Sequence, residues 1–119
     1  MLVEKYISHV ESCIEKALRC ESKCSPEILS MEGMSGQYTR HFYNNLLNID
    51  DARYLEIGAY KGSSTCSAMY ENKAIISVVD NWSEFGGPRE ECINNIVKYA
   101  KNINDVFVVD CDSFQTEIP

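Results

Sequence analysis

The fold of this chain is decided by residues 53–64, which read RYLEIGAYKGSS. An apolar, β-prone run at residues 54–57 ends abruptly at Gly58, and Gly62 follows four residues later. The serines after Gly62 open a segment with helical character. A strand, a glycine turn and a helix N-terminus in this order let backbone N–H groups approach a ligand closely, and the helix dipole favours negative charge there. The stretch therefore predicts an anion- or nucleotide-binding turn.

The spacing of the two glycines separates this turn from two common nucleotide motifs. A phosphate loop carries its lysine directly after the last glycine, whereas Lys61 precedes Gly62 here. A dinucleotide-binding turn has a second glycine where this chain has Tyr60. The sequence therefore disfavours both a phosphate loop and an NAD-type domain.

Length and charge restrict the class of protein. The chain has 119 residues, 45% of them hydrophobic, which suits one small globular domain. Its net charge is −7, and its lysines and arginines are scattered, so nucleic-acid binding is not expected. No segment approaches the ~18 apolar residues of a membrane span, and the N-terminus lacks the uninterrupted apolar core of a signal peptide. We therefore expect a cytoplasmic protein with no membrane partner.

Residues 1–30 are expected to form a unit of their own, an amphipathic helix that runs from residue 2 to about residue 24. Ser25-Pro26 would end it, because the residue before a proline avoids the helical region. His9 and Cys24 would lie about 22 Å apart along such a helix, too far to share one ion. No metal site is therefore expected, and all six cysteines are predicted to be free thiols. The expected apolar face consists of Tyr6, Val10, Cys13, Ala17, Cys20 and Cys24.

Another helix is expected ahead of the first strand. Ser35 is a candidate N-cap residue, and Tyr38, Phe42 and Leu46 recur at the i, i+4, i+8 spacing of an apolar helix face. His41 on this helix is a candidate general base, but an exposed or capping role is favoured because the sequence supplies no partner for it.

The segments after the glycine turn alternate between helix and strand. A short helix is expected at 63–70, and residues 74–79 read AIISVV, typical of a strand buried on both faces in a parallel sheet. A helix that begins at Pro88 and a strand at 106–109 follow. This alternation predicts an α/β fold: a Rossmann-like three-layer parallel sheet of about three strands, with the first strand central, preceded by two N-terminal helices.

Acidic side chains lie at the carboxyl end of each expected strand, where such sheets bind their ligands. Glu56 precedes the glycine turn, Asp80 ends the second strand and Asp110 ends the third. Asp80 comes 18 residues after Gly62, close to the ~20 expected for an acid that binds ribose hydroxyls. Carboxylates also cap loops and helices at such positions, so a structural role stays open for each of them.

Three segments resemble motifs of class I S-adenosylmethionine-dependent methyltransferases. They read EIGAYKGSST at 56–65, VVDNWSEFGGP at 78–88 and DCDSF at 110–114. The segment at 33–47, GMSGQYTRHFYNNLL, is similar to the lead-in of that family, so the resemblance covers about residues 31–119. It implies S-adenosylmethionine as the cofactor. The cofactor-binding residues that it implies are Glu56, Gly58, Ala59, Tyr60, Gly62, Ser63, Asp80, Asn81, Trp82, Asp112 and Ser113.

The resemblance also implies roles for these residues. Glu56 and the two glycines of the turn would line the methionine and ribose part of the cofactor. Asp80 would accept hydrogen bonds from the ribose hydroxyls, and Trp82 would pack beside the adenine. Asp112 and Ser113 would meet the adenine edge.

The chain supplies three strands, whereas members of that family have about seven. The missing strands usually carry the acceptor site and any catalytic group, so no catalytic residue is named. We therefore expect the cofactor-binding half of a methyltransferase; the alternative is a non-catalytic module that binds S-adenosylmethionine or a related nucleoside. Because residues 106–109 or 74–79 would form an unpaired apolar sheet edge, we expect a homo-oligomer, completion by the missing C-terminal half, or cover from residues 2–24.

Overall fold

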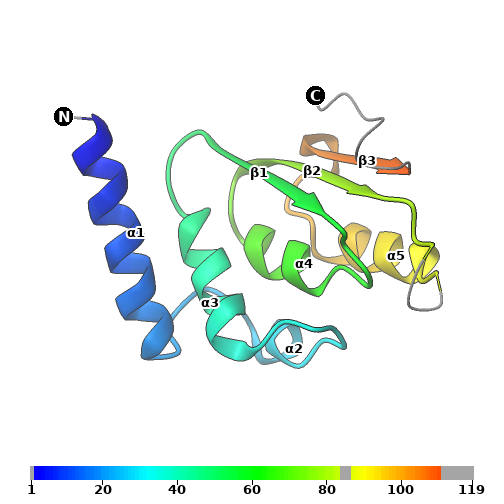
Figure 1. Ribbon diagram of the computed structural model, residues 1–119, viewed down its shortest axis with the longest axis horizontal. Helices are drawn as coiled ribbons and strands as arrows, with labels where there is room; N and C mark the ends of the chain where they lie inside the picture. The colour runs from blue at the N-terminus through cyan, green and yellow to red at the C-terminus, as the bar shows by residue number, and fades with distance from the viewer. Residues whose placement is uncertain (1, 84–86, 111–119) are drawn as a thin grey trace.

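The computed structural model describes residues 2–83 and 87–110 (Figure 1). Parallel strands alternate with helices after an N-terminal helical segment, which confirms the expected α/β, Rossmann-like arrangement. None of the described helices combines the length and the apolarity needed to cross a membrane. The division of the chain at residue 30 stays a prediction. The elements are α1 (Leu2–Leu18), α2 (Pro26–Leu29), α3 (Gln37–Leu46), β1 (Ala52–Ile57), α4 (Ser63–Met69), β2 (Ala74–Asp80), α5 (Arg89–Tyr99), the 3₁₀ turn η1 (Ile103–Asp105) and β3 (Val106–Asp110).

The sheet has the order β1-β2-β3, and both strand pairs are parallel. Leu55 lies opposite Ser77, which in turn lies opposite Phe107. The expectation that the first strand is central was wrong. Of the two segments expected as the sheet edge, residues 106–109 form an edge of the described sheet and residues 74–79 do not. β2 lies in the middle, paired with β1 and β3, and its residues 76–79 are all buried.

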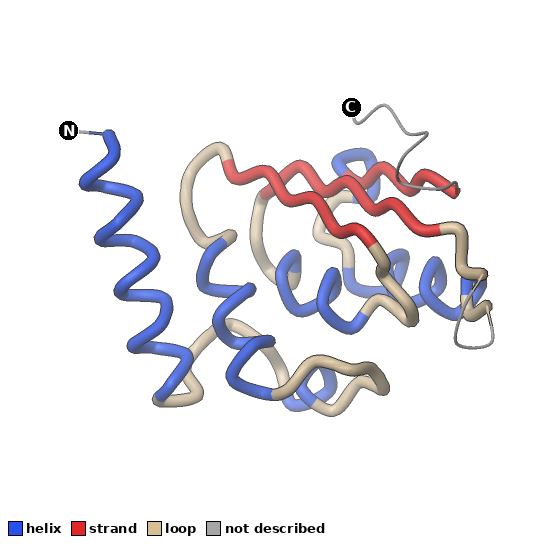
Figure 2. Tube along the Cα trace, viewed as in Figure 1, coloured by secondary structure: helices blue, strands red, loops and turns tan. Residues whose placement is uncertain are grey.

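α2, α3, α4 and α5 lie on one side of the sheet, and α1 lies beside α3, farther from the strands, as Figures 1 and 2 show. Ile76 and Val78 point toward that helical layer and are fully buried there, where they pack with Ile96 of α5. Truncating a fully buried isoleucine costs about 2–5 kcal/mol, so these contacts fix the distance between sheet and helices. The core holds the strands, and hence their carboxyl ends, at defined positions.

α1 ends at Leu18, six residues earlier than expected from the position of the proline. The chain turns there because Cys20 adopts a left-handed conformation, with φ 57°. The Cys20 N–H donates to Ala17 O at 2.9 Å, and the Glu21 N–H donates to Lys16 O at 2.9 Å. These two bonds form a Schellman motif, which satisfies the last carbonyls of the helix. The position of Cys20 is one that usually holds glycine.

Replacing Cys20 by glycine should raise the free energy of unfolding by about 0.5–1 kcal/mol, because glycine adopts positive φ without a steric penalty. Urea unfolding measures the change. Cys20→Ala is the matched control, since it removes the thiol but keeps the Cβ, and it should give no such gain. Equal stability of the two variants would contradict this account of the helix end.

α3 buries polar residues instead of the apolar face expected at Tyr38, Phe42 and Leu46. Tyr38 is 58% exposed, and the N-cap residue is Gly36, not Ser35. The helix lies between α1 and α4, where backbone carbonyls of neighbouring turns need donors. The buried residues of α3 are Arg40, His41, Asn44 and Asn45.

Asn44 shows why a polar side chain belongs in this layer. Its Nδ2 donates to Ser67 O and Tyr70 O, both at 2.9 Å, and its Oδ1 accepts from the Lys23 N–H at 3.0 Å. Asn44 is fully buried and joins the end of α4 to the loop after α1. Polar side chains therefore connect α3 to its neighbours alongside the apolar packing of Tyr43, Leu46 and Leu47.

Candidate functional site

The glycine turn forms at the carboxyl end of β1, as the sequence predicted. Gly58 has φ 81° and Gly62 has φ 89°, values that L-residues rarely adopt. The Gly58 N–H donates to Val79 O at 2.9 Å, which ties the start of the turn to β2. A Cβ added at Gly58 would have no atom within 4 Å, so the turn is open to an incoming molecule on this side.

Asp80 joins the glycine turn to the loop after β2. Its Oδ2 accepts from the Tyr60 N–H at 3.2 Å, and its Oδ1 accepts from the Trp82 N–H at 2.8 Å. The Trp82 Nε1–H donates to Tyr60 O at 2.8 Å and closes the link. Asp80 thus has the structural role that the sequence left open. Each carboxylate oxygen accepts one of these bonds and can accept another from a ligand.

Trp82 forms a wall of this edge of the molecule. It is 5% exposed and has a left-handed backbone, with φ 50°. The Arg89 guanidinium lies over its ring, 5.9 Å from the centroid, and also pairs with Asp110 at the end of β3. The ring is therefore fixed in place, whereas the neighbouring Asn81 is exposed at the same edge.

Glu56 lies beside α4, where its carboxylate is half-buried. Its Oε1 accepts from the Tyr54 hydroxyl at 2.9 Å and from Thr65 Oγ1 at 3.2 Å. Burial raises the pKa of Glu56, and these two hydrogen bonds oppose the shift. The carboxylate therefore connects β1 to α4 beneath the turn.

The N-terminus of α4 is covered by a segment that the sequence analysis did not include in the site. Ser63 is buried, and a Cβ added at Gly33 would lie 2.0 Å from Ser63 Oγ. Ser35 Oγ lies 3.3 Å from the same oxygen, and Lys61 Nζ pairs with Glu32 at 2.7 Å. Gly33 in the GMSG lead-in was the available signal, since a close backbone approach requires glycine.

Arg40 holds this covering segment in place. The side chain is 3% exposed, and its Nη1 donates to Ile28 O at 3.0 Å, Leu29 O at 3.1 Å and Met31 O at 2.8 Å. Its Nε donates to Ser35 O and Ser35 Oγ, both at 3.1 Å. The guanidinium therefore satisfies the carbonyls at the end of α2 and fixes residues 28–35 against α4.

The structure brings most of the expected site residues to one edge. Residues from the ends of β1 and β2 meet there through the Asp80 link, with Ser63 below the covering segment and Glu56 beside α4. Two expected residues, Asp112 and Ser113, lie outside the described residues. The expected residues at this edge are Gly58, Ala59, Tyr60, Gly62, Asp80, Asn81 and Trp82.

His41 is buried, so the expectation of an exposed histidine was wrong. It is 3% exposed, and its Nδ1 lies 2.6 Å from Ser22 Oγ. Ser22 Oγ also accepts from the Cys24 N–H at 3.1 Å, so the serine hydroxyl links the imidazole to the backbone after α1. His41 therefore connects α3 to the loop after α1 and stays away from the carboxyl ends of the strands.

The burial of His41 predicts a pH dependence of stability. Burial lowers the pKa of His41 below 6.5, so the unfolded chain binds its proton first as pH falls. The stability that neutral His41 contributes is complete above about pH 6.5 and is lost as pH falls toward the lower pKa of the folded state. Urea unfolding between about pH 7.5 and about pH 5.5 should show a loss of stability that His41→Gln reduces. The pKa of Glu56 is raised, so Glu56 changes stability with pH in the opposite direction. If the pH profile of stability were the same in His41→Gln as in the wild type, the assignment to His41 would be refuted.

The cysteines of the described residues are free, and the buried ones have protonated thiols. Burial raises the pKa of Cys66 to about 12 and that of Cys92 to about 11. Cys24 donates weakly to Arg40 O and Ser67 O, at 3.8 and 3.6 Å. Within residues 2–83 and 87–110, no three His, Cys, Asp or Glu side chains are grouped as metal ligands. That all six cysteines are reduced and metal-free in solution stays a prediction.

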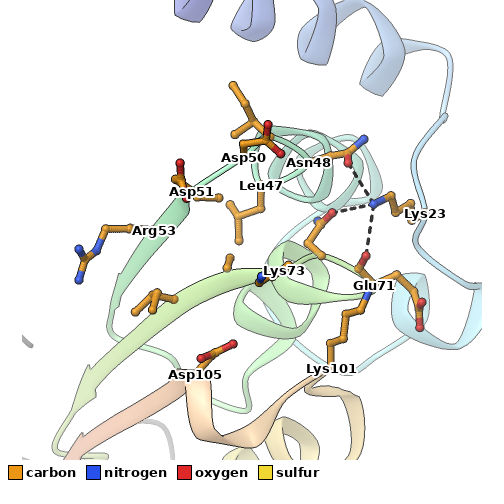
Figure 3. A pocket seen from close by; sticks show the side chains of 15 residues that line it. Lys23, Leu47, Asn48, Asp50, Asp51, Arg53, Glu71, Lys73, Lys101 and Asp105 are labelled. Atoms are coloured by element: carbon orange, nitrogen blue, oxygen red, sulfur yellow. Dashed lines mark hydrogen bonds between the residues drawn. The ribbon is translucent and has the colours of Figure 1, made fainter.

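A cleft of about 820 Å³ lies at the opposite end of the sheet, where the strands begin (Figure 3). Lys23 lines it and donates through Nζ to Asn48 Oδ1 at 3.0 Å, Asn72 Oδ1 at 3.0 Å and Glu71 O at 3.2 Å. The carboxyl ends of α3 and α4 approach this cleft, and helix carboxyl ends favour cations. The position of Lys23 is therefore explained by its structural hydrogen bonds. The site residues expected from the sequence lie at the other end of the sheet.

No protein-family model matches the chain, and no curated protein matches it. The chain is similar to the crystal structure of coclaurine N-methyltransferase bound to N-methylheliamine and SAH, with a TM-score of 0.49 and 15% sequence identity. The match covers 96% of this chain and 41% of that enzyme, so the chain spans about two fifths of the enzyme's length.

Proposed function

We propose that the chain binds S-adenosylmethionine, or its demethylated product, at the glycine turn, as the cofactor-binding part of a methyltransferase. The observation that carries this proposal is the cover over the N-terminus of α4. Phosphate groups of nucleotides bind at such helix N-termini after a glycine turn. Here Ser63 is buried beneath Gly33 and Ser35, whereas Gly58 is open. This arrangement favours a nucleoside without phosphates over NAD or ATP.

Asp80 is the residue proposed to bind the ribose. Its carboxylate lies at the end of β2, next to the open turn, and each oxygen can accept a further hydrogen bond. A hydrogen bond to a charged group contributes about 1.5–3 kcal/mol. Trp82 and Asn81 at the same edge are proposed to contact the base. Asn81 presents an exposed amide, whereas Trp82 is 5% exposed and leaves only a small part of its ring open to a ligand.

When bound, S-adenosylmethionine supplies an electrophilic methyl group on a sulfonium. The residues of this chain contribute binding and orientation, because methyl transfer depends mainly on the positioning of donor and acceptor. The Asp80 link fixes two loops relative to each other, and Arg40 fixes the cover of α4. The described residues therefore form a rigid cofactor site, and no catalytic residue is assigned among them. The alternative of a binding module without transfer activity rests on the same site.

Isothermal titration calorimetry tests this proposal with S-adenosylmethionine, its demethylated product, NAD and ATP. We expect the two sulfur nucleosides to bind and the two phosphate-bearing nucleotides to give no heat. Gly58→Ala should weaken binding, because its methyl group enters the open side of the turn. Gly36→Ala controls for the added methyl group alone, since neither glycine has an atom within 4 Å of an added Cβ, and urea unfolding of Gly58→Ala measures the strain that an L-residue adds at φ 81°. Binding of NAD or ATP with no response to either sulfur nucleoside would refute the proposal.

A further inference from the structure

α1 carries an apolar stripe that stays exposed after the helix has packed on α3. The helix buries Cys13 and Ala17, and α3 is its main neighbour. At about 100° per residue, five further apolar residues fall within an arc of about 80°, which also contains Ala17, whereas Cys13 lies about 60° outside it. Their exposed fractions run from 38% to 65%. We call this the α1 stripe; it consists of Val3, Ile7, Val10, Ile14 and Leu18.

A second exposed apolar surface lies on β1. Leu55 is 46% exposed and Ile57 is 60% exposed, and Arg53 on the same face is also exposed. These three residues form the outer face of β1, because side chains alternate along a strand and the residues between them are half-buried toward the helices. Their neighbours in register on β2, Ser77 and Val79, are already buried. The uncovered apolar area is therefore concentrated on the edge strand.

We propose that these two surfaces bind each other between two copies of the chain. The α1 stripe of one copy packs on the outer face of β1 of the second, and the second copy returns the same contact. Within one copy the two surfaces cannot meet, because α1 packs on α3 and α3 packs on α4, on the helical side of the sheet (Figure 1). A second copy supplies the missing layer on the outer face.

The outer face of β1 is short enough for the α1 stripe to cover it. The α1 stripe runs over 15 residue steps, about 22 Å at 1.5 Å per residue. From Arg53 to Ile57 the outer face of β1 runs over four residue steps, about 13 Å at 3.3 Å per residue. A helix laid along the strand therefore covers Leu55 and Ile57 with one continuous stripe.

Charge selects this pairing over a contact between two α1 helices. Glu11 and Glu15 border the α1 stripe, so an antiparallel pair of these helices would bring acidic side chains together. Arg53 carries a positive charge on the outer face of β1, and the helix-on-strand contact brings it near that acidic border. The exchange is reciprocal, so a two-fold dimer buries both surfaces of both copies and closes the assembly.

Sedimentation equilibrium of the full chain over a concentration series tests the proposal. We expect a dimer, and we expect Ile7→Glu and Ile57→Glu each to raise its dissociation constant at least about a hundredfold, because each places an unpaired charge in the contact twice. Leu2→Glu is the matched control: Leu2 is a 62% exposed leucine of α1 that lies outside the 80° arc. It should leave the dimer unchanged. Circular dichroism establishes that all three variants are folded.

Mixing the Ile7→Glu and Ile57→Glu chains distinguishes a contact of the α1 stripe with β1 from a contact of α1 with α1. The Ile7→Glu chain keeps an intact outer face of β1, and the Ile57→Glu chain keeps an intact α1 stripe, so the mixture should recover a heterodimer through one good contact. Loss of the dimer in Ile7→Glu but not in Ile57→Glu would show that α1 pairs with α1 and would overturn the proposal. A wild-type monomer at every concentration, or a mass that keeps growing beyond a dimer, would also overturn it.

Discussion

Arg40→Leu should lower the free energy of unfolding by about 3 kcal/mol or more, the largest effect expected of a single side chain outside the apolar core. The guanidinium is buried without a carboxylate partner and satisfies four carbonyl oxygens and one hydroxyl. Each buried carbonyl left without a donor costs about 1–3 kcal/mol. Arg40→Lys should recover part of the loss, because an ammonium keeps the charge but cannot reach both ends of the segment.

Urea unfolding of Arg40→Leu measures this effect, and Arg19→Leu is the matched control. Arg19 is exposed and pairs with an exposed Glu21, an interaction worth about 0–1 kcal/mol. A loss of stability in Arg40→Leu no larger than in the control would show that water replaces the guanidinium. The variant should also loosen the cover of α4, since Gly33 and Ser35 lie within the segment that Arg40 holds.

Asp80→Ala should weaken binding of S-adenosylmethionine by about ten- to a hundredfold, if one charge-assisted hydrogen bond of about 1.5–3 kcal/mol is lost. The same substitution removes the acceptor of the Tyr60 and Trp82 amides, so it should also lower stability by about 1–2 kcal/mol. The two effects are separable, because calorimetry reports affinity and urea unfolding reports stability.

Asp80→Asn sharpens this test. Its amide oxygen can still accept from one backbone N–H, so stability should recover in part, whereas affinity should stay low because the charge is gone. Asp105→Ala, at the other end of the sheet, removes a carboxylate without touching the turn and should leave affinity unchanged. A folded Asp80→Ala that binds with unchanged affinity would reduce Asp80 to a structural link between two loops.

Local signals in the sequence determined the strands, the glycine turn and the alternation of strand and helix. The run AIISVV at 74–79 could only be a buried strand, and Gly58 and Gly62 lie where the backbone needs positive φ. The position of Asp80 at the end of its strand followed from the same reasoning. These features depend on interactions between residues that are close together in the chain, so a local sequence pattern is enough to predict them.

The tertiary structure alone decided which polar side chains are buried and which segments meet. Hydrophobic periodicity predicted that Tyr38 lies on the buried face of α3. Instead Arg40 and Asn44 are buried, because carbonyl groups of distant segments need their N–H donors. Strand order and the contact of Gly33 with Ser63 are long-range pairings that no local pattern encodes. The sequence by itself determined the glycine turn at which we propose that a ligand binds. The cover that closes the helix N-terminus beside it exists only because a buried arginine holds a loop 30 residues upstream.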